Sequence, residues 1–183
     1  DSVSQHGQSS AMRYIPGSTM RGLIVSSLAK DDEFESIKTM LFSEKTIYTN
    51  AYPYVEGREL IPSPKGFYED KSLSENKKSI ENVTIKGEFT DGYKRAGLGE
   101  FCHIEEDTIY YHSVDTMSDL KVTINTDKKD LFRLEMMSPR QSFIGYVYIE
   151  DDNLKDRIKD IFRDKIHIGN GKSSGVGTCR VVE

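Results

Sequence analysis

The residues best suited to chemistry lie near the carboxyl end, where IHIGNGKSSGVG (residues 166–177) combines four glycines with a lysine and two serines. Glycines leave backbone N–H groups accessible, so such a segment can wrap closely around phosphates. It is not a nucleotide-binding P-loop, because that motif requires glycine where Ile166 stands and leads into a helix, whereas this loop leads into a strand. The dinucleotide fingerprint also fails, since Ser174 occupies its third glycine position. Two interpretations remain, a phosphate-holding loop and a hairpin-like connector.

Composition and charge narrow the class of protein. The chain has 183 residues, 36% of them hydrophobic and 30% charged, which is typical of about one globular domain. Its net charge of -5 argues against non-specific nucleic-acid binding by the whole surface but leaves a local basic groove open. There is no run of 18 apolar residues, so we expect no membrane span. Two cysteines outside any CxxC pair predict a reducing, cytoplasmic setting.

The amino-terminal stretch DSVSQHGQSS reads as a polar loop. It has no initiator methionine and no basic region followed by an apolar one, so we expect no signal peptide. We interpret the chain as a fragment of a longer protein.

Hydrophobic spacing predicts two helices in the amino-terminal part. A turn at residues 14–18 leads into the first, with Ser18 placed as its N-cap. A second, short helix is predicted over residues 32–41, where acidic residues precede the apolar positions. The apolar positions are Met20, Leu23, Ile24 and Leu28 in the first helix, and Phe34, Ile37 and Leu41 in the second.

The pattern changes after residue 46. Residues 46–141 read as hairpins and long loops, because prolines and glycines interrupt short β-rich runs. Residues 143–149 then read as a strand, Asp152 can cap a following helix, and residues 179–182 form a closing strand. With one more strand ahead of residue 1, this order would give a βαββαβ ferredoxin-like domain. The apolar face of the last helix consists of Leu154, Ile158, Ile161 and Phe162.

Two motifs, in this order, resemble a known family. YIPGSTMRG at residues 14–22 resembles the IPGSSLKG signature of the CRISPR-associated RAMP (repeat-associated mysterious protein) superfamily, and IGNGKSSGVG at 168–177 resembles its carboxyl-terminal glycine-rich loop. Between them, YTNAYP at 48–53 and IPSPK at 61–65 look like a segment of the larger RAMP subunits of type III effector complexes. The similarity is nearest to the type III-D subunit.

The resemblance implies a fold and a set of partners. The fold would be α+β, a ferredoxin-like (RRM-like) single RAMP domain over residues 1–183, with long β-rich insertions and the family's first strand missing from this chain. The larger subunits carry a second RAMP domain, so the chain would be part of a longer protein. The implied role is that of a structural subunit that binds the guide RNA (crRNA) without a cofactor, beside other RAMP subunits and the large subunit of the complex. Target RNA stays open as a further partner.

The resemblance also implicates residues, since in the family the glycine-rich loop and the helix start contact the guide-RNA backbone. Backbone N–H groups, hydroxyls and a helix N-terminus all donate to phosphate oxygens without reading sequence. Arg21, expected in the first helical turn, either clamps a phosphate or is a solvated surface arginine. Tyr14, Tyr48 and Tyr52 either stack on unpaired bases or belong to the core. The implied RNA-binding residues are Ser18, Thr19, Arg21, Gly169, Gly171, Lys172, Ser173, Ser174, Gly175 and Gly177.

Two enzymatic alternatives stay open. Backbone RAMP subunits of type III complexes cut target RNA with an aspartate ahead of the IPGS motif, and Asp1 stands at a comparable distance. Only in that case would Mg²⁺ be needed, and no residue is predicted as a ligand of a resident metal. Another branch processes guide precursors with a histidine as general base, and His6 is the candidate for that role.

Overall fold

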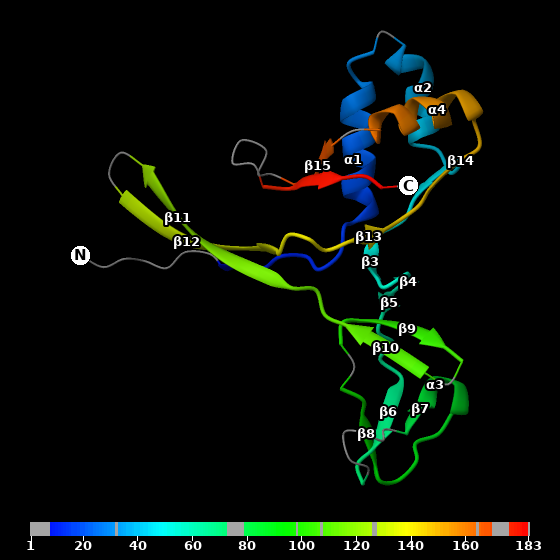
Figure 1. The fold of residues 1–183 in the computed structure, drawn as a ribbon. Coiled ribbons are helices and arrows are strands. Elements are labelled where there is room, and N and C mark those ends of the chain that lie inside the picture. Colours follow the sequence, from blue (N-terminus) through cyan, green and yellow to red (C-terminus); the bar gives the residue numbers. More distant parts are fainter. Residues whose placement is uncertain are drawn as a thin grey trace. The chain divides into compact units, whose positions relative to one another are not determined.

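The computed structural model describes residues 8–31, 33–72, 79–97, 99–106, 108–125, 128–163, 165–169 and 176–182. The chain divides into two compact units (Figure 1). Unit 1 comprises Asp1–Ala11 and Pro53–Ser142, and unit 2 comprises Met12–Tyr52 and Phe143–Glu183. Unit 2 therefore contains both sequence motifs, and most of unit 1 is inserted between them. The prediction of a single domain stays a prediction.

Three helices build the core of unit 2. They are α1 (Gly17–Leu28), α2 (Phe34–Leu41) and α4 (Asp152–Ile161). Each turns one apolar stripe inward, and burying an aliphatic side chain of this size stabilises the fold by roughly 1.5–3 kcal/mol. The predicted apolar faces are confirmed except in α1, where Met20 and Leu23 are only half-buried and lie outside the core. The core consists of Ile24, Leu28, Leu41, Leu154 and Ile158.

The two predicted helix caps were each misplaced. Helix α1 begins at Gly17 and follows Pro16, which has no side-chain hydrogen bond to offer, so Ser18 lies inside the helix and is not its N-cap. Helix α4 is capped by Asp151, whose carboxylate accepts from the Leu154 N–H at 2.7 Å, and Asp152 is its first residue. The extended backbone of Asp151 brings its carboxylate within reach of this N–H, which is the geometry that an N-cap requires.

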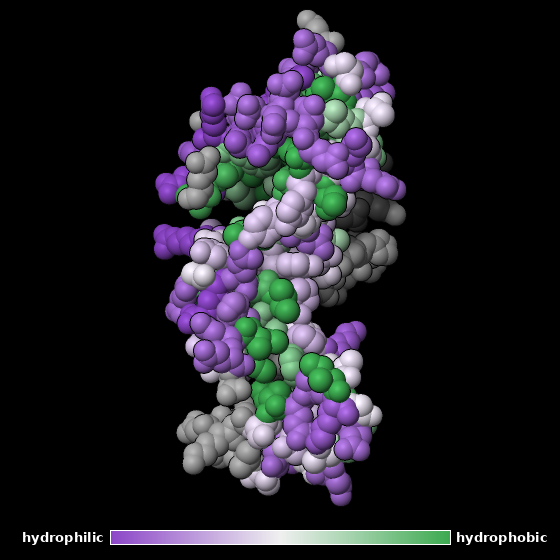
Figure 2. Space-filling view, turned by 90° about the vertical axis from the view of Figure 1, so that its right-hand side faces the viewer, coloured by the Kyte–Doolittle hydropathy of each residue, from purple (hydrophilic) through white to green (hydrophobic). Residues whose placement is uncertain are grey.

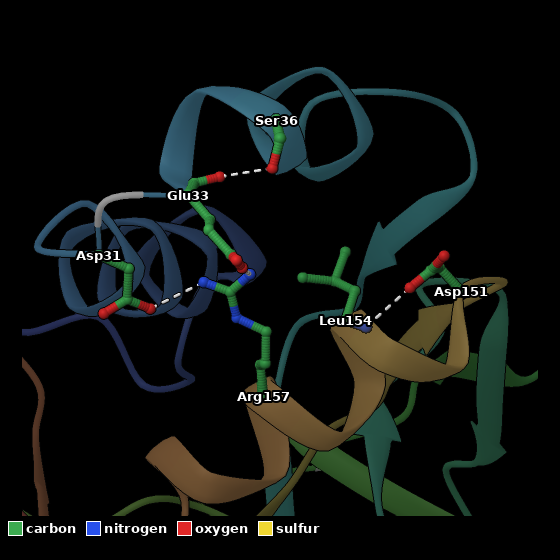
Figure 3. A network of polar contacts seen from close by, with 6 residues as sticks. All are labelled: Asp31, Glu33, Ser36, Asp151, Leu154 and Arg157. Atoms are coloured by element: carbon green, nitrogen blue, oxygen red, sulfur yellow. Dashed lines mark hydrogen bonds and ion pairs between the residues drawn. The ribbon is translucent and has the colours of Figure 1, made fainter.

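An ion-pair network ties α4 to the connection between α1 and α2 (Figure 3). The Arg157 guanidinium lies 2.8 Å from an Asp31 carboxylate oxygen and 3.4 Å from one of Glu33. Arg157 is 27% exposed, so this pair is less screened by water than the pairs within single surface helices. The acidic residues that the sequence places ahead of α2 therefore also position α4.

The strands of unit 2 form two antiparallel pairs. β2 (Thr46–Tyr48) pairs with β14 (Val147–Ile149), and β15 (Lys165–His167) pairs with β16 (Thr178–Arg180). The single strand predicted over 143–149 is interrupted, because β13 (Phe143–Ile144) ends before Gly145 and Tyr146. The Tyr146 N–H there donates to the Thr49 hydroxyl at 2.7 Å instead of a backbone carbonyl. The sequence did not predict β15.

Unit 1 contains most of the short strands and hairpins predicted for residues 46–141, whereas β2 belongs to unit 2. Its longest element is a hairpin of β11 (Thr116–Asn125) and β12 (Lys128–Met137), and β1 (Gln8–Ser9) runs parallel to β12. Among the side chains that the structure describes in this unit, the buried apolar ones include Leu60, Phe67, Phe101, Cys102 and Val114. The remaining elements are β3 (Tyr52–Val55), β4 (Arg58–Glu59), β5 (Ile61–Pro62), β6 (Phe67–Asp70), β7 (Ile80–Asn82), α3 (Val83–Lys86), β8 (Tyr93–Arg95), β9 (Phe101–Glu105) and β10 (Thr108–His112).

The fold is therefore α+β, with small, mostly antiparallel sheets and few helices, and it is consistent with the ferredoxin-like prediction. In unit 2 the order α1, β2, β14, α4 and the β15–β16 hairpin follows the predicted order. Among the described residues ahead of α1 the structure has the strand β1, and this strand pairs with β12 in unit 1. It does not supply the strand that the ferredoxin-like pattern places before the first helix.

Candidate nucleic-acid interface

The start of α1 is pressed against the segment that follows β2. Ile15 and Ala51 exchange two backbone hydrogen bonds of 3.0 and 2.8 Å, which fix the chain just before the helix. Gly17 is buried, and a Cβ at this position would overlap the Tyr48 carbonyl oxygen and lie 2.9 Å from that of Thr49. A glycine is therefore required at the first helical position because two backbones meet there.

Asn50 connects this helix start to an aromatic side chain. Its side-chain oxygen accepts a hydrogen bond from the Gly17 N–H at 2.9 Å, and its amide nitrogen donates to the Tyr52 hydroxyl at 3.0 Å. Asn50 thus supplies, from 33 positions away, the side-chain acceptor that Pro16 cannot provide. Sequence reasoning gave Asn50 no role, although the resemblance had already singled out YTNAYP at 48–53.

The predicted RNA-binding residues of α1 have different surroundings. Thr19 is half-buried and its N–H donates to the Pro16 carbonyl at 2.9 Å, whereas Ser18 and Arg21 are exposed and, three residues apart, share one face of the helix. Arg21 lies in the second helical turn, not the first, because the helix begins at Gly17. Its guanidinium carbon is 5.7 Å from the centre of the Phe42 ring, and within the described part of the chain no carboxylate pairs with it. Its guanidinium nitrogens can therefore donate to an anion.

The three tyrosines near the helix start fall into two groups. The Tyr14 and Tyr52 rings are half-buried, with centres 5.8 Å apart and a tilt of 45°. Tyr48 packs against the core, and its hydroxyl donates to the Leu41 carbonyl at 3.1 Å. Burial raises the pKa of Tyr48, and the nearby positive charge of Arg21 opposes that rise. Of the three, Tyr48 therefore has a structural role and does not offer a ring for base stacking.

The ends of the glycine-rich loop form the top of the β15–β16 hairpin. His167 and Thr178 face each other in this ladder, and the Ile168 N–H donates to the Gly177 carbonyl at 2.8 Å. Gly169 and Gly177 both have positive φ angles, 95° and 86°, and a Cβ on Gly177 would also overlap the Ile168 carbonyl oxygen. These two predicted residues thus close the loop. The other predicted residues, Gly171, Lys172, Ser173, Ser174 and Gly175, lie outside the described residues.

The described residues contain no evident catalytic or metal-binding cluster. Asp1 and His6 lie outside them. Within the described ranges, no group of three or more histidine, cysteine or acidic side chains could hold a metal ion. The Nε2 atom of His167 is buried and has no hydrogen-bond partner among the described residues. Burial raises the pKa of the Cys102 thiol, which disfavours a reactive thiolate.

Comparisons with known proteins agree with the sequence motifs. The model of the RAMP superfamily matches residues 4–180, a span that includes parts of both units and both ends of the candidate interface. A search of curated protein sequences finds no significant match. In the part of the chain that the structure describes, no helix is long and apolar enough to cross a membrane.

Proposed function

The chain belongs to the RAMP superfamily and so has a CRISPR-associated, RNA-binding function, and we propose that it is a guide-binding structural subunit of a type III effector complex. In this proposal it is the large RAMP subunit of a type III-D-like complex. In this proposal it works in the cytoplasm without a cofactor, beside the crRNA, other RAMP subunits and the large subunit. The RNA backbone lies against the start of α1 and the glycine-rich loop.

One observation carries this proposal, namely the arrangement at the start of α1. Asn50 satisfies the Gly17 N–H, while for the next N–H, that of Ser18, no acceptor is present among the described residues. This N–H points out of the positive end of the helix, where a phosphate oxygen is stabilised. Arg21 adds a cation on the same face, and within the described residues no carboxylate neutralises it. Both groups bind phosphate without reading base sequence.

The composition of the site favours single strands. The Tyr14 and Tyr52 rings lie next to the helix start, where they can contact unpaired bases, while paired bases in an RNA helix are stacked on each other. Because each phosphate that a cationic side chain neutralises releases counterions, affinity should fall as salt rises, and more steeply the more phosphates the site binds. Filter binding of a single-stranded guide-like RNA and of its duplex, each at two salt concentrations, tests both expectations.

Two variants of the full chain test the proposed contacts. Replacing Gly171 and Gly175 together by valine adds bulk without charge to the loop and should weaken guide binding by about 1–3 kcal/mol, with an unchanged thermal melt. Arg21→Ala should lower RNA affinity. The slope of log affinity against log salt concentration should become shallower by about 1, as expected for the loss of one phosphate contact. Arg163→Ala is the control, since Arg163 is an exposed arginine just beyond the end of α4 and is paired with Asp160 at 3.0 Å. Equal affinities for all three variants and the wild type would reject the proposed site.

The alternative, a RAMP endoribonuclease that needs a metal only for target cutting, has a separate test. It depends on Asp1 for target cutting or on His6 for processing of the guide precursor, and neither residue is described by the structure. If Asp1 is catalytic, Asp1→Ala should abolish Mg²⁺-dependent cutting of complementary RNA and leave guide binding intact. If the wild type cuts complementary RNA and Asp1→Ala does not, the chain is a nuclease and the proposal of a purely structural subunit is wrong.

A further inference from the structure

The β2–β14 pair in unit 2 has one face inside the core and one face outside. Tyr48, Val147 and Ile149 pack against the helical core, with α1 contacting β2 and α4 contacting β14. Side chains alternate along a strand, so their neighbours point to the opposite face. We call this opposite face the outer face; it carries Ile47, Tyr146 and Tyr148, which are 55%, 43% and 56% exposed. Figure 2 shows hydrophobic residues at the surface between hydrophilic ones.

The two tyrosines of the outer face form a nearly parallel pair. Their ring centres are 6.1 Å apart and their planes differ by 29°. Tyr148 lies directly opposite Ile47 in the ladder. The backbone of Tyr146 is fixed by Thr49, whose N–H donates to the Tyr146 carbonyl at 3.0 Å and whose hydroxyl accepts from the Tyr146 N–H. The rings therefore stand on a held backbone with aromatic surface directed away from the core.

We propose that the outer face binds unpaired bases of single-stranded RNA by stacking on Tyr146 and Tyr148. This inference rests on the proposed function for its ligand class but uses a surface that the predicted backbone contacts do not include. Sheets that expose aromatic rings on the face without helices are a common platform for single-stranded RNA, because every base has a face to stack. The side chains of Tyr146 and Tyr148 are amphipathic, and their hydroxyls can stay hydrated when a base covers the rings.

The surroundings of the rings supply a cation and a continuous path that a single strand of RNA can use. At one end of the face Lys45 pairs with Glu150 at 3.4 Å, and both side chains are about two-thirds exposed, at 67% and 69%. Such a pair contributes little to stability, so Lys45 can exchange its carboxylate for a phosphate. At the other end Thr49 leads directly into Asn50 and the contact with Gly17. One strand can thus continue from the outer face to the start of α1.

A fluorescence experiment on the full chain tests base stacking. The sequence contains no tryptophan, so Tyr148→Trp places one reporter on the outer face. Tyr111→Trp is the matched control, because Tyr111 is similarly exposed, at 47%, on a strand of unit 1. An oligouridylate should quench the fluorescence of the Tyr148→Trp protein in a saturable way, and an abasic oligonucleotide of the same length should not. The Tyr111→Trp protein should respond to neither.

Affinity measurements separate this inference from the proposed function. Replacing Tyr146 and Tyr148 by serine should lower RNA affinity by about 5-fold to 150-fold for each ring, whereas both phenylalanine variants should bind like the wild type. If the wild type binds RNA but the serine variants bind equally well and the reporter is not quenched, the outer face does not bind bases and the inference is wrong, while the proposed function stands. If the wild type binds no RNA, both are wrong.

Discussion

Replacing Asn50 with alanine removes two hydrogen bonds that meet at the start of α1. The first is the cap on the Gly17 N–H at 2.9 Å, and a lost cap of this kind costs about 1 kcal/mol. The second is the 3.0 Å bond to the Tyr52 hydroxyl, whose net contribution is also about 1 kcal/mol. We therefore expect the free energy of unfolding to fall by about 2 kcal/mol, a substantial part of the 5–15 kcal/mol typical of a folded protein.

Asn50→Asp is the variant that separates capping from RNA binding. Its carboxylate can still accept from the Gly17 N–H, it lies at the positive end of a helix, and the Tyr52 hydroxyl can turn to donate to it. Stability at neutral pH should therefore stay within about 0.5 kcal/mol of the wild type. An added negative charge about 4 Å from a phosphate costs about 1 kcal/mol even in water, so RNA affinity should fall by about fivefold.

Urea denaturation and RNA binding of the two variants, measured side by side, check this reasoning. The alanine variant should lose stability and, through a displaced Tyr52, affinity as well. The aspartate variant should lose affinity alone. The role assigned to the cap is wrong if the free energy of unfolding of Asn50→Ala lies within about 0.3 kcal/mol of the wild-type value. It is also wrong if Asn50→Asp is as unstable as Asn50→Ala.

Further predictions concern stability. Burial raises the pKa of Tyr48, so the unfolded chain loses this proton first and stability falls as the pH rises above about 10; alkaline denaturation should be less steep for Tyr48→Phe. Gly17→Ala forces a Cβ against backbone carbonyl oxygens and should cost about 1–3 kcal/mol in a urea titration, whereas Gly22→Ala, with open space around it, should be neutral or stabilising. Arg157→Met keeps most of the packing but removes the ion pairs, so it should cost about 1 kcal/mol, and high salt should shrink the difference from the wild type.

The periodic parts of the fold could be predicted from the sequence. The stripes around Leu28, Leu41 and Ile158 specify three amphipathic helices, and those helices form the core of unit 2. The helix boundaries could not be placed with the same accuracy. Asp151 and Asp152 are identical in type, and only the backbone angles decide which carboxylate reaches the free N–H groups.

The candidate site was predicted in part, for a physical reason. Short motifs identified the helix start and the loop, because both need glycine at fixed positions. Asn50 and the Tyr146–Tyr148 pair were missed, since their roles depend on contacts with residues distant in sequence or on which strand face is left uncovered. The alternation in Tyr146-Val147-Tyr148 indicated that the two tyrosines share one face of the predicted strand. It did not indicate which face of that strand packs against the helices.

The hydrogen bond between Ile168 and Gly177 also bears on how much the length and composition of the glycine-rich loop can vary. It holds the two ends of a ten-residue segment together at the top of a paired stem, so the stem fixes where the loop starts and ends whatever lies between. The entropy of closing a loop grows only with the logarithm of its length, by about 0.6 kcal/mol for each doubling. Insertions within the loop should therefore cost little folding free energy, so its length and chemistry can change while the hairpin beneath it stays paired.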